Sequence, residues 1–170
     1  KNKLSYFNRI IKLLIQIQSI KHRKVKNFRN QNYIIPKYDK KILINEANLF
    51  CDWYAKNNLS KLRKKRFCKK FKKIIKELTL KLKLKDNIFV HRDFHVSNLM
   101  SVKNQIGLID SQDALIGNKA YDLASLIDDV RLKTSYSFKE KIFKFYIKKQ
   151  KNLDIKKFKN DFEILSVLRN

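Results

Sequence analysis

Apolar residues recur three or four positions apart over most of this chain. Such a period predicts amphipathic helices that each turn one face toward a core. The predicted helices cover six segments: 4–20, 42–55, 60–82, 119–131, one beginning at Ser137 and one beginning near Asp154. Ser60 is placed to cap the third helix, and Ser137 with Glu140 has the spacing of a capping box.

Two of these predicted helices have well-defined apolar faces. The helix over 42–55 is expected to pack through Leu43, Ala47, Phe50 and Tyr54. The helix over 60–82 is expected to pack through Phe67, Phe71, Ile74, Ile75, Leu78 and Leu82. Residues 21–40 are polar and basic and include the only proline, Pro36, so we expect a loop there.

The hydrophobic period changes in the middle of the chain. Residues 88–90 form a short apolar run suited to a buried strand, and segments 99–102 and 106–109 predict a hairpin. The predicted fold is therefore mainly α-helical with a small β insert over 88–110. A chain of 170 residues is long enough to bury a core of its own.

The charge of the chain is large and unevenly distributed. The formal net charge is +26, and lysine outnumbers arginine 33 to 8, a profile that A/T-rich codons would give to many proteins. Fourteen basic residues fall within 56–85, mostly on the solvated faces of a predicted helix. Residues 86–131 reverse the sign, with seven acids against four basic residues. This acidic stretch is where chemistry that needs carboxylates should be sought.

Composition excludes several classes of protein. The 44% hydrophobic content argues against disorder, and no window of 18 apolar residues predicts a membrane span. Cys51 and Cys68 form neither a CxxC motif nor a disulfide framework, which favours a reducing, cytoplasmic setting.

One constellation in the acidic stretch has the form that phosphoryl transfer requires. Residues 91–98 read HRDFHVSN, an HxDxxxxN pattern, and Asp110 follows at the end of the predicted hairpin. Asp93, in a loop between strands, is suited to orient an acceptor hydroxyl and take its proton. Asn98 and Asp110 offer the hard oxygen donors that Mg²⁺ prefers, and the hairpin would bring them together.

These residues resemble the catalytic and metal-binding segments of the aminoglycoside phosphotransferase and choline kinase superfamily, which shares the protein-kinase fold. The closer resemblance is to bacterial amino-sugar kinases that phosphorylate N-acetylmuramate and N-acetylglucosamine at the anomeric hydroxyl. Five segments carry it: HRDFHxxNLM at 91–100, IDxQDAxxG at 109–117, YDLASL beginning the segment 121–128, IPKYD at 35–39 and LFxxWY at 49–54.

The resemblance implies a phosphotransferase that uses ATP and Mg²⁺ to phosphorylate a small-molecule hydroxyl, with an amino sugar as the expected substrate. It implies that Asp93 is the catalytic base and that His91 and Arg92 shape the catalytic loop. It also implies that Asn98 and Asp110 are the Mg²⁺ ligands.

Three further polar residues belong to the same motifs. By the resemblance, Asp122 would be a structural acid that hydrogen-bonds the backbone of the catalytic loop. Asp113 belongs to the metal segment 109–113, where it could face the sugar or brace the loop. His95 has no assigned role.

The family also has an N-terminal lobe with a glycine loop and a strand lysine that hold the phosphates. This chain has only Gly107 and Gly117, both downstream of the catalytic loop. We therefore expect residues 1–170 to be a kinase-like C-terminal lobe, truncated at both ends, whose nucleotide-binding residues are unassigned. Such a lobe would have little or no kinase activity alone, and the missing lobe would come from the rest of the gene product.

Other readings remain open at this point. A pseudokinase lobe that only binds is disfavoured by the intact Asp93, Asn98 and Asp110, and a nucleic-acid-binding protein would depend on the basic run over 56–85. A transition-metal site at His91, Asp93 and His95 is disfavoured because further His or Cys ligands are absent nearby. Asp128 and Asp129 are expected to be solvated charges on a helix, and the two cysteines to be inert packing residues.

Overall fold

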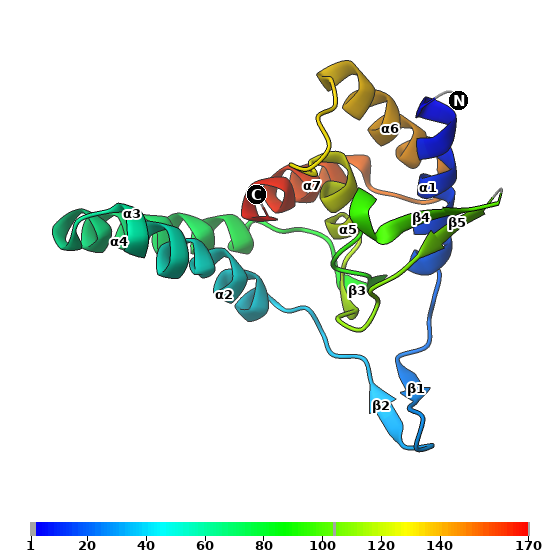
Figure 1. The fold of residues 1–170 in the computed structure, drawn as a ribbon, viewed down its shortest axis with the longest axis horizontal. Helices are drawn as coiled ribbons and strands as arrows, with labels where there is room; N and C mark the ends of the chain where they lie inside the picture. The colour runs from blue at the N-terminus through cyan, green and yellow to red at the C-terminus, as the bar shows by residue number, and fades with distance from the viewer. Residues whose placement is uncertain (1–2, 104, 170) are drawn as a thin grey trace.

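The computed structural model describes residues 3–103 and 105–169. It confirms a mainly helical fold with small sheets (Figure 1). The helices are α1 (Lys3–Gln18), α2 (Lys40–Phe50), the π-helical turn η1 (Cys51–Ala55), α3 (Lys56–Asn58), α4 (Lys61–Leu80), the 3₁₀ turn η2 (Val96–Asn98), α5 (Tyr121–Ile127), α6 (Tyr136–Lys149) and α7 (Ile155–Arg169). The strands are β1 (Lys24–Lys26), β2 (Asn32–Ile34), β3 (Asp86–Val90), β4 (Leu99–Val102), β5 (Gln105–Leu108) and β6 (Leu115–Asn118).

The hydrophobic core lies among α1, α5, α6 and α7. Helix α5 is buried along its whole length and packs on α6 and α7, while α1 packs on α6 (Figure 1). The largest side chains in this core are completely or almost completely enclosed: Ile11, Leu14, Leu123, Leu126, Ile142, Tyr146, Phe158 and Leu165. Removing these apolar surfaces from water is the main stabilising contribution to the fold. Residues 91–98, which carry the HxDxxxxN motif, therefore rest on a well-packed base.

Two antiparallel strand pairs frame that segment. β3 pairs with β6, with Val90 opposite Leu115, and β4 pairs with β5, with Leu99 opposite Leu108. The second pair is the predicted hairpin; its turn residue Asn104 lies outside the described residues. Strand β6 was not predicted, because four residues that include Gly117 give too short a signal.

The segment before α2 is tied to the free edge of β6. The backbone N–H of Tyr38 donates to the carbonyl of Ile116 at 2.8 Å, and the N–H of Ile116 donates to the carbonyl of Pro36 at 2.8 Å. A Cβ at Gly117 would lie 3.0 Å from the Cβ of Tyr38, tighter than most such contacts, so this close approach favours glycine. As a result, Tyr38 and the start of α2 are held next to the segment 91–98.

Helices α2 and α4 form an arm that extends from the body (Figure 1). Asp39 caps α2 by accepting from the backbone N–H of Ile42. The buried face is Leu43, Ala47, Cys51 and Ala55. Phe50 and Tyr54, which were predicted to share this face, are 41% and 56% exposed, and Phe50 packs against aromatic rings along the arm. The π turn is wider than an α turn, which keeps residues four apart on one face.

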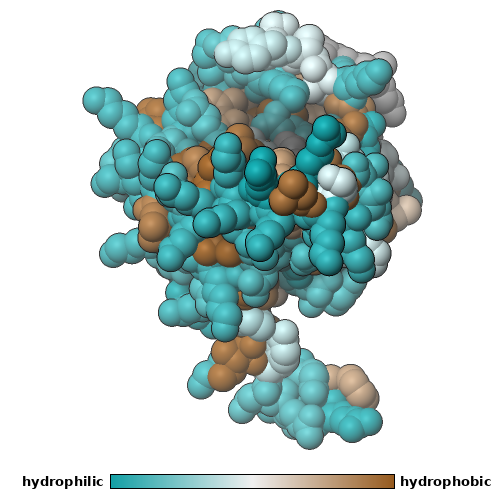
Figure 2. Space-filling model, turned by 90° about the vertical axis from the view of Figure 1, so that its left-hand side faces the viewer, coloured by the Kyte–Doolittle hydropathy of each residue, from teal (hydrophilic) through white to brown (hydrophobic). Residues whose placement is uncertain are grey.

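Helix α4 confirms the predicted boundaries but only part of the predicted stripe. Ile75 and Thr79 are buried, whereas Ile74 is 53% exposed and Phe67 is also exposed. Phe67 and Phe71 instead stack with Phe50 of α2 along the arm. The lysines of this helix are nearly all solvent-exposed, as predicted, and hydrophilic residues cover most of the face seen in Figure 2.

The predicted loop over 21–40 was wrong in part, because β1 and β2 form a short hairpin that projects from the body (Figures 1 and 2). The side chain of Asn27 folds its turn by accepting from the backbone N–H groups of Arg29 and Gln31. Strands of three residues are too short to show a hydrophobic period, so this hairpin could not be predicted from the pattern.

Two predicted helix ends and one predicted cap also differ in the structure. Helix α5 ends at Ile127, well before the predicted 131. Helix α6 begins after Ser135, whose hydroxyl accepts from the N–H of Phe138, so the predicted capping box at Ser137 and Glu140 was wrong. Ser60 precedes α4 without a side-chain cap bond, whereas α7 begins after Asp154 as predicted.

Among residues 3–103 and 105–169, no helix is long and apolar enough to cross a membrane.

Candidate active site

The loop that carries Asp93 follows β3 and is fastened to α5 by Asp122. The two carboxylate oxygens of Asp122 accept from the backbone N–H groups of His91 at 2.8 Å and Arg92 at 3.0 Å. Arg92 has a positive φ of 79°, which turns the chain sharply at this point. One buried side chain therefore fixes two successive peptide groups immediately before Asp93.

The environment of Asp122 is unusual for a carboxylate. Its side chain is completely buried, and burial raises the pKa of this carboxyl to about 7 even though the two backbone N–H groups act to lower it. A buried acid held at this cost needs a compensating role. Here that role is to accept from two successive backbone N–H groups and fix the course of the loop.

Hydrogen bonds within the loop fix the backbone of Asp93. Its carbonyl accepts from the N–H of His95 and from the side-chain amide of Asn98, both at 3.0 Å. The side chain of Asp93 is half-buried and lines a pocket of about 270 Å³. The carboxylate therefore sits on a rigid backbone at the wall of an open cavity.

Asn98 and Asp110 are brought close by the β4–β5 hairpin. The N–H of Ile109, the neighbour of Asp110, donates to the carbonyl of Asn98 at 3.1 Å. Because the Asn98 amide nitrogen already donates to Asp93, its side-chain oxygen is the atom left for a cation. Asp110 is exposed, has a positive φ of 68° and accepts a hydrogen bond from Gln112. An amide oxygen and a carboxylate fit Mg²⁺, which takes few protein ligands.

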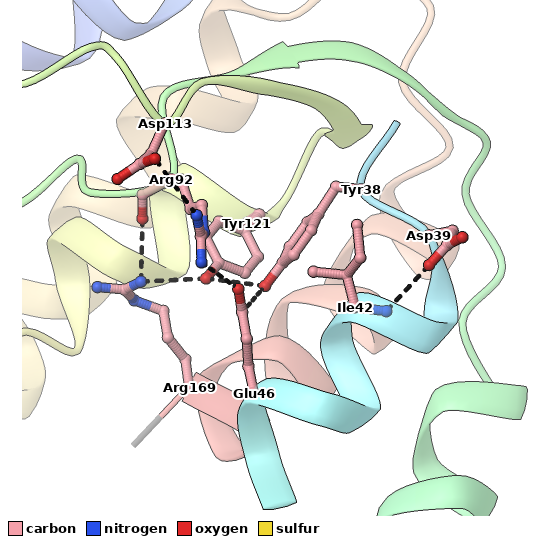
Figure 3. Close-up of polar contacts among 8 residues, drawn as sticks. All are labelled: Tyr38, Asp39, Ile42, Glu46, Arg92, Asp113, Tyr121 and Arg169. Carbon is pink, nitrogen blue, oxygen red and sulfur yellow. Dashed lines mark hydrogen bonds and ion pairs between the residues drawn. The ribbon is translucent and has the colours of Figure 1, made fainter. Parts of the chain in front are cut away.

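Arg92 belongs to a polar cluster with Glu46, Asp113, Tyr38 and Tyr121 (Figure 3). Its guanidinium donates to the carboxylate of Glu46 in α2 and lies 4.0 Å from the carboxylate of Asp113. Glu46 also accepts from the hydroxyl of Tyr38, which lies 3.1 Å from the hydroxyl of Tyr121. Burial raises the pKa of Tyr38 above its ordinary value, so this hydroxyl stays protonated and can donate. The cluster joins α2, the loop and α5.

The pocket lies between the catalytic loop and this cluster. It is lined by Tyr38, Leu43, Glu46, Leu49, Arg92, Asp93, Tyr121, Leu168 and Arg169. Its volume of about 270 Å³ is just below the range of small-molecule sites, which is about 300–1,000 Å³. Its walls mix leucine side chains with charged groups, as a polar small molecule with an apolar face requires.

The two histidines of the loop are buried. A ring nitrogen of His91, Nε2, lies 3.1 Å from the carbonyl of Ile109, which ties the loop to the segment before Asp110. Burial lowers the pKa of both His91 and His95, so both favour the neutral form. Among the described residues no group of three His, Cys, Asp or Glu side chains could hold a metal ion, so the transition-metal reading finds no support.

The expectation that Asp128 and Asp129 are solvated was wrong. Asp129 is buried, accepts from the backbone N–H of Val96 at 3.3 Å and pairs with Arg131 at 3.2 Å. Burial opposes its ionisation, but these hydrogen bonds outweigh burial and lower the pKa of Asp129. Asp128 pairs with Lys139 of α6 at 2.7 Å. The helix ends before both residues, which turns them toward the loop and α6 instead of solvent.

Sequence reasoning did not single out Glu46, Tyr38, Arg169 or Asp129 as site residues. Glu46 and Arg169 lie 46 and 77 positions from Arg92, so no local pattern links them to the loop. Tyr38 did carry a signal, since it stands in the IPKYD segment of the resemblance. Asp113 approaches Arg92, which is consistent with bracing the loop but leaves its role a prediction.

Comparisons with known proteins bear on this site. A model of the phosphotransferase enzyme family matches residues 5–153. An N-acetylmuramate/N-acetylglucosamine kinase of Neisseria meningitidis is 32% identical over 105 residues, which cover 62% of this chain and 31% of that protein. A kinase of the same name from Pseudomonas aeruginosa is 34% identical over 96 residues, which cover 56% of this chain and 28% of that protein.

The matched part of the chain thus spans less than a third of the length of these two relatives. The resemblance to amino-sugar kinases is confirmed at the level of the family, and the match includes the catalytic loop, the hairpin and α5. The chain therefore belongs to the phosphotransferase enzyme family.

Proposed function

We propose that this chain is the catalytic lobe of a kinase-like phosphotransferase that transfers a phosphoryl group from ATP to a hydroxyl of an amino sugar, N-acetylmuramate or N-acetylglucosamine. The observation that carries the proposal is the fixed loop around Asp93, with Asn98 and the Asp110 segment beside it. The names of the relatives support the choice of substrate. A cytoplasmic setting, where ATP is abundant, fits two free cysteines.

In this proposal Asp93 orients the acceptor hydroxyl and accepts its proton. General-base catalysis of this kind contributes about 10²- to 10⁴-fold to the rate. Asn98 and Asp110 would hold Mg²⁺ through their side-chain oxygens, and the metal would neutralise charge on the transferred phosphate. Asp122 acts indirectly, because its two hydrogen bonds hold the backbone that presents Asp93.

The test is Asp93→Asn in the complete gene product, with phosphorylation of both sugars followed by ³¹P NMR. Asparagine keeps the shape of the side chain but cannot accept the proton, so kcat should fall at least about 100-fold. Asp52→Asn is the matched control: this acid lies on the exposed side of η1, and the same change there should leave kcat unaltered. Full activity in the Asp93→Asn variant would refute the catalytic assignment.

The metal assignment has its own measurement. Mn²⁺ can replace Mg²⁺ as a probe of oxygen ligands, and its binding is followed by electron paramagnetic resonance in the presence of ATP. Asp110→Asn should weaken Mn²⁺ binding about tenfold or more, because a charged ligand becomes a neutral one. Unchanged Mn²⁺ affinity in that variant would remove Asp110 from the metal site.

A further inference from the structure

Arg169, near the end of α7, is fixed against the catalytic loop. Its NH1 nitrogen donates to the carbonyl of Arg92 at 3.0 Å and to the hydroxyl of Tyr121 at 3.3 Å. The guanidinium also lies over the ring of Tyr121, 5.3 Å from its centroid. These three contacts hold the charge in one place, next to the residue that precedes Asp93.

Among residues 3–103 and 105–169, the hydrogen bonds of this guanidinium all use NH1. The opposite edge, formed by NH2 and Nε, is the edge that binds a carboxylate with two parallel hydrogen bonds. Figure 3 shows one guanidinium nitrogen of Arg169 pointing away from Arg92 and Tyr121. Within the described part of the chain, no carboxylate lies within 4 Å of Arg169. A half-buried, immobilised cation of this kind has a fork available for an anionic ligand.

The other arginine of the pocket is differently placed. Arg92 is committed to Glu46 and faces Asp113, so its charge is already balanced. Arg169 and Asp93 line the same pocket, together with Leu49 and Leu168. A sugar that presents a hydroxyl to Asp93 would therefore lie within reach of the free guanidinium edge.

We propose that Arg169 binds a carboxylate carried by the acceptor sugar, so that the pocket selects a carboxylate-bearing amino sugar over its neutral counterpart. This inference rests on the proposed function. N-acetylmuramate carries a lactyl carboxylate that N-acetylglucosamine lacks, and the two sugars are otherwise closely alike. A bidentate, charge-assisted pair would favour the acid, and binding made to the carboxylate alone would not help the neutral sugar.

The experiment compares Arg169→Met with the unaltered complete gene product, using N-acetylmuramate, its methyl ester and N-acetylglucosamine as acceptors. The ratio of kcat/KM for N-acetylmuramate over its methyl ester should fall about 10- to 100-fold in the variant. Most of that fall should appear as a higher KM for the acid. Arg169→Lys keeps the charge but not the fork, so its ratio should lie between the two. Arg63→Met, on the exposed face of α4, is the control for lost charge and should keep the original ratio.

The outcomes separate this inference from the proposed function. If the unaltered protein phosphorylates these sugars and Arg169→Met leaves the acid-to-ester ratio unchanged, the inference is overturned while the proposed function stands. An equal fall in kcat for all three acceptors also overturns it, because Arg169 would then act on the phosphoryl group or the loop. If no sugar is phosphorylated by the unaltered protein, the proposed function fails, and this inference fails with it.

Discussion

A substitution at Glu46 would measure how much the contact between helix α2 and the loop that carries Asp93 contributes to stability. Its carboxylate accepts hydrogen bonds from both Arg92 of the loop and Tyr38 of the preceding segment. Replacing Glu46 by Gln keeps the size of the side chain but removes its charge. The loop would then lose the charged partner that ties it to α2, while the core remains intact.

The expected decrease in the free energy of unfolding follows from the two hydrogen bonds that Glu46 accepts. A bond to a charged group contributes about 1.5–3 kcal/mol and a neutral one about 0.5–1.5 kcal/mol, so two weakened bonds cost roughly 2 kcal/mol. The side chains of Arg92 and Glu46 are 31% and 27% exposed, which lets solvent screen part of the interaction. We therefore expect Glu46→Gln to lower the free energy of unfolding by about 1–2 kcal/mol.

Urea denaturation followed by circular dichroism measures this change. A double-mutant cycle with Arg92→Met isolates the pair, and the coupling free energy should be about 1 kcal/mol. Glu77→Gln, at an exposed acid of α4 that forms only an i,i+4 pair at 3.9 Å, is the matched control and should change stability by less than about 0.5 kcal/mol. A coupling free energy near zero would refute the view that α2 anchors the loop through this ion pair.

Three further predictions concern the framework around the site. Gly117→Ala should destabilise the fold by about 1–3 kcal/mol in urea denaturation, because the added Cβ meets the Cβ of Tyr38 at 3.0 Å; unchanged stability would mean that the strand can shift. Asp161→Asn should cost about 2–4 kcal/mol, since the buried carboxylate accepts four hydrogen bonds, two of them from backbone N–H groups at 2.8 Å; a loss below 1 kcal/mol would contradict this. Burial lowers the pKa of His95, so as the pH falls the unfolded chain takes up a proton before the folded one does, and stability should decrease below about pH 6.5. The difference in unfolding free energy between wild type and His95→Gln should therefore shrink between pH 7 and pH 5. A constant difference would argue against the lowered pKa.

Local patterns in the sequence determined much of this protein. The periods of three or four residues predicted α1, α4 and α7, because an amphipathic helix is encoded within the segment that forms it. The β4–β5 hairpin was predictable for the same reason, since its strands are neighbours in the chain. The HxDxxxxN motif likewise placed Asp93 and Asn98 within one loop, where the structure has Asn98 bonded to the carbonyl of Asp93.

Features that depend on distant partners were not predictable. Strand β6 is stabilised by its pairing with β3. The π turn that follows α2 has the same hydrophobic pattern as an ordinary α-helix, so the pattern does not reveal it. The cap of α6 fell on Ser135, although Ser137 had the better local motif. In each case neighbouring sequence alone admits more than one structure, and long-range packing selects one.

The division between what local sequence predicts and what long-range packing selects is clearest at the candidate site. The local motif predicts the chemistry: a carboxylate and two oxygen donors within an acidic stretch of a basic chain. What surrounds these residues depends on packing, because Glu46 and Arg169 reach Arg92 from 46 and 77 positions away. Contacts of that kind form only when α2 and α7 pack beside the loop, since no local hydrogen bond or hydrophobic period encodes them.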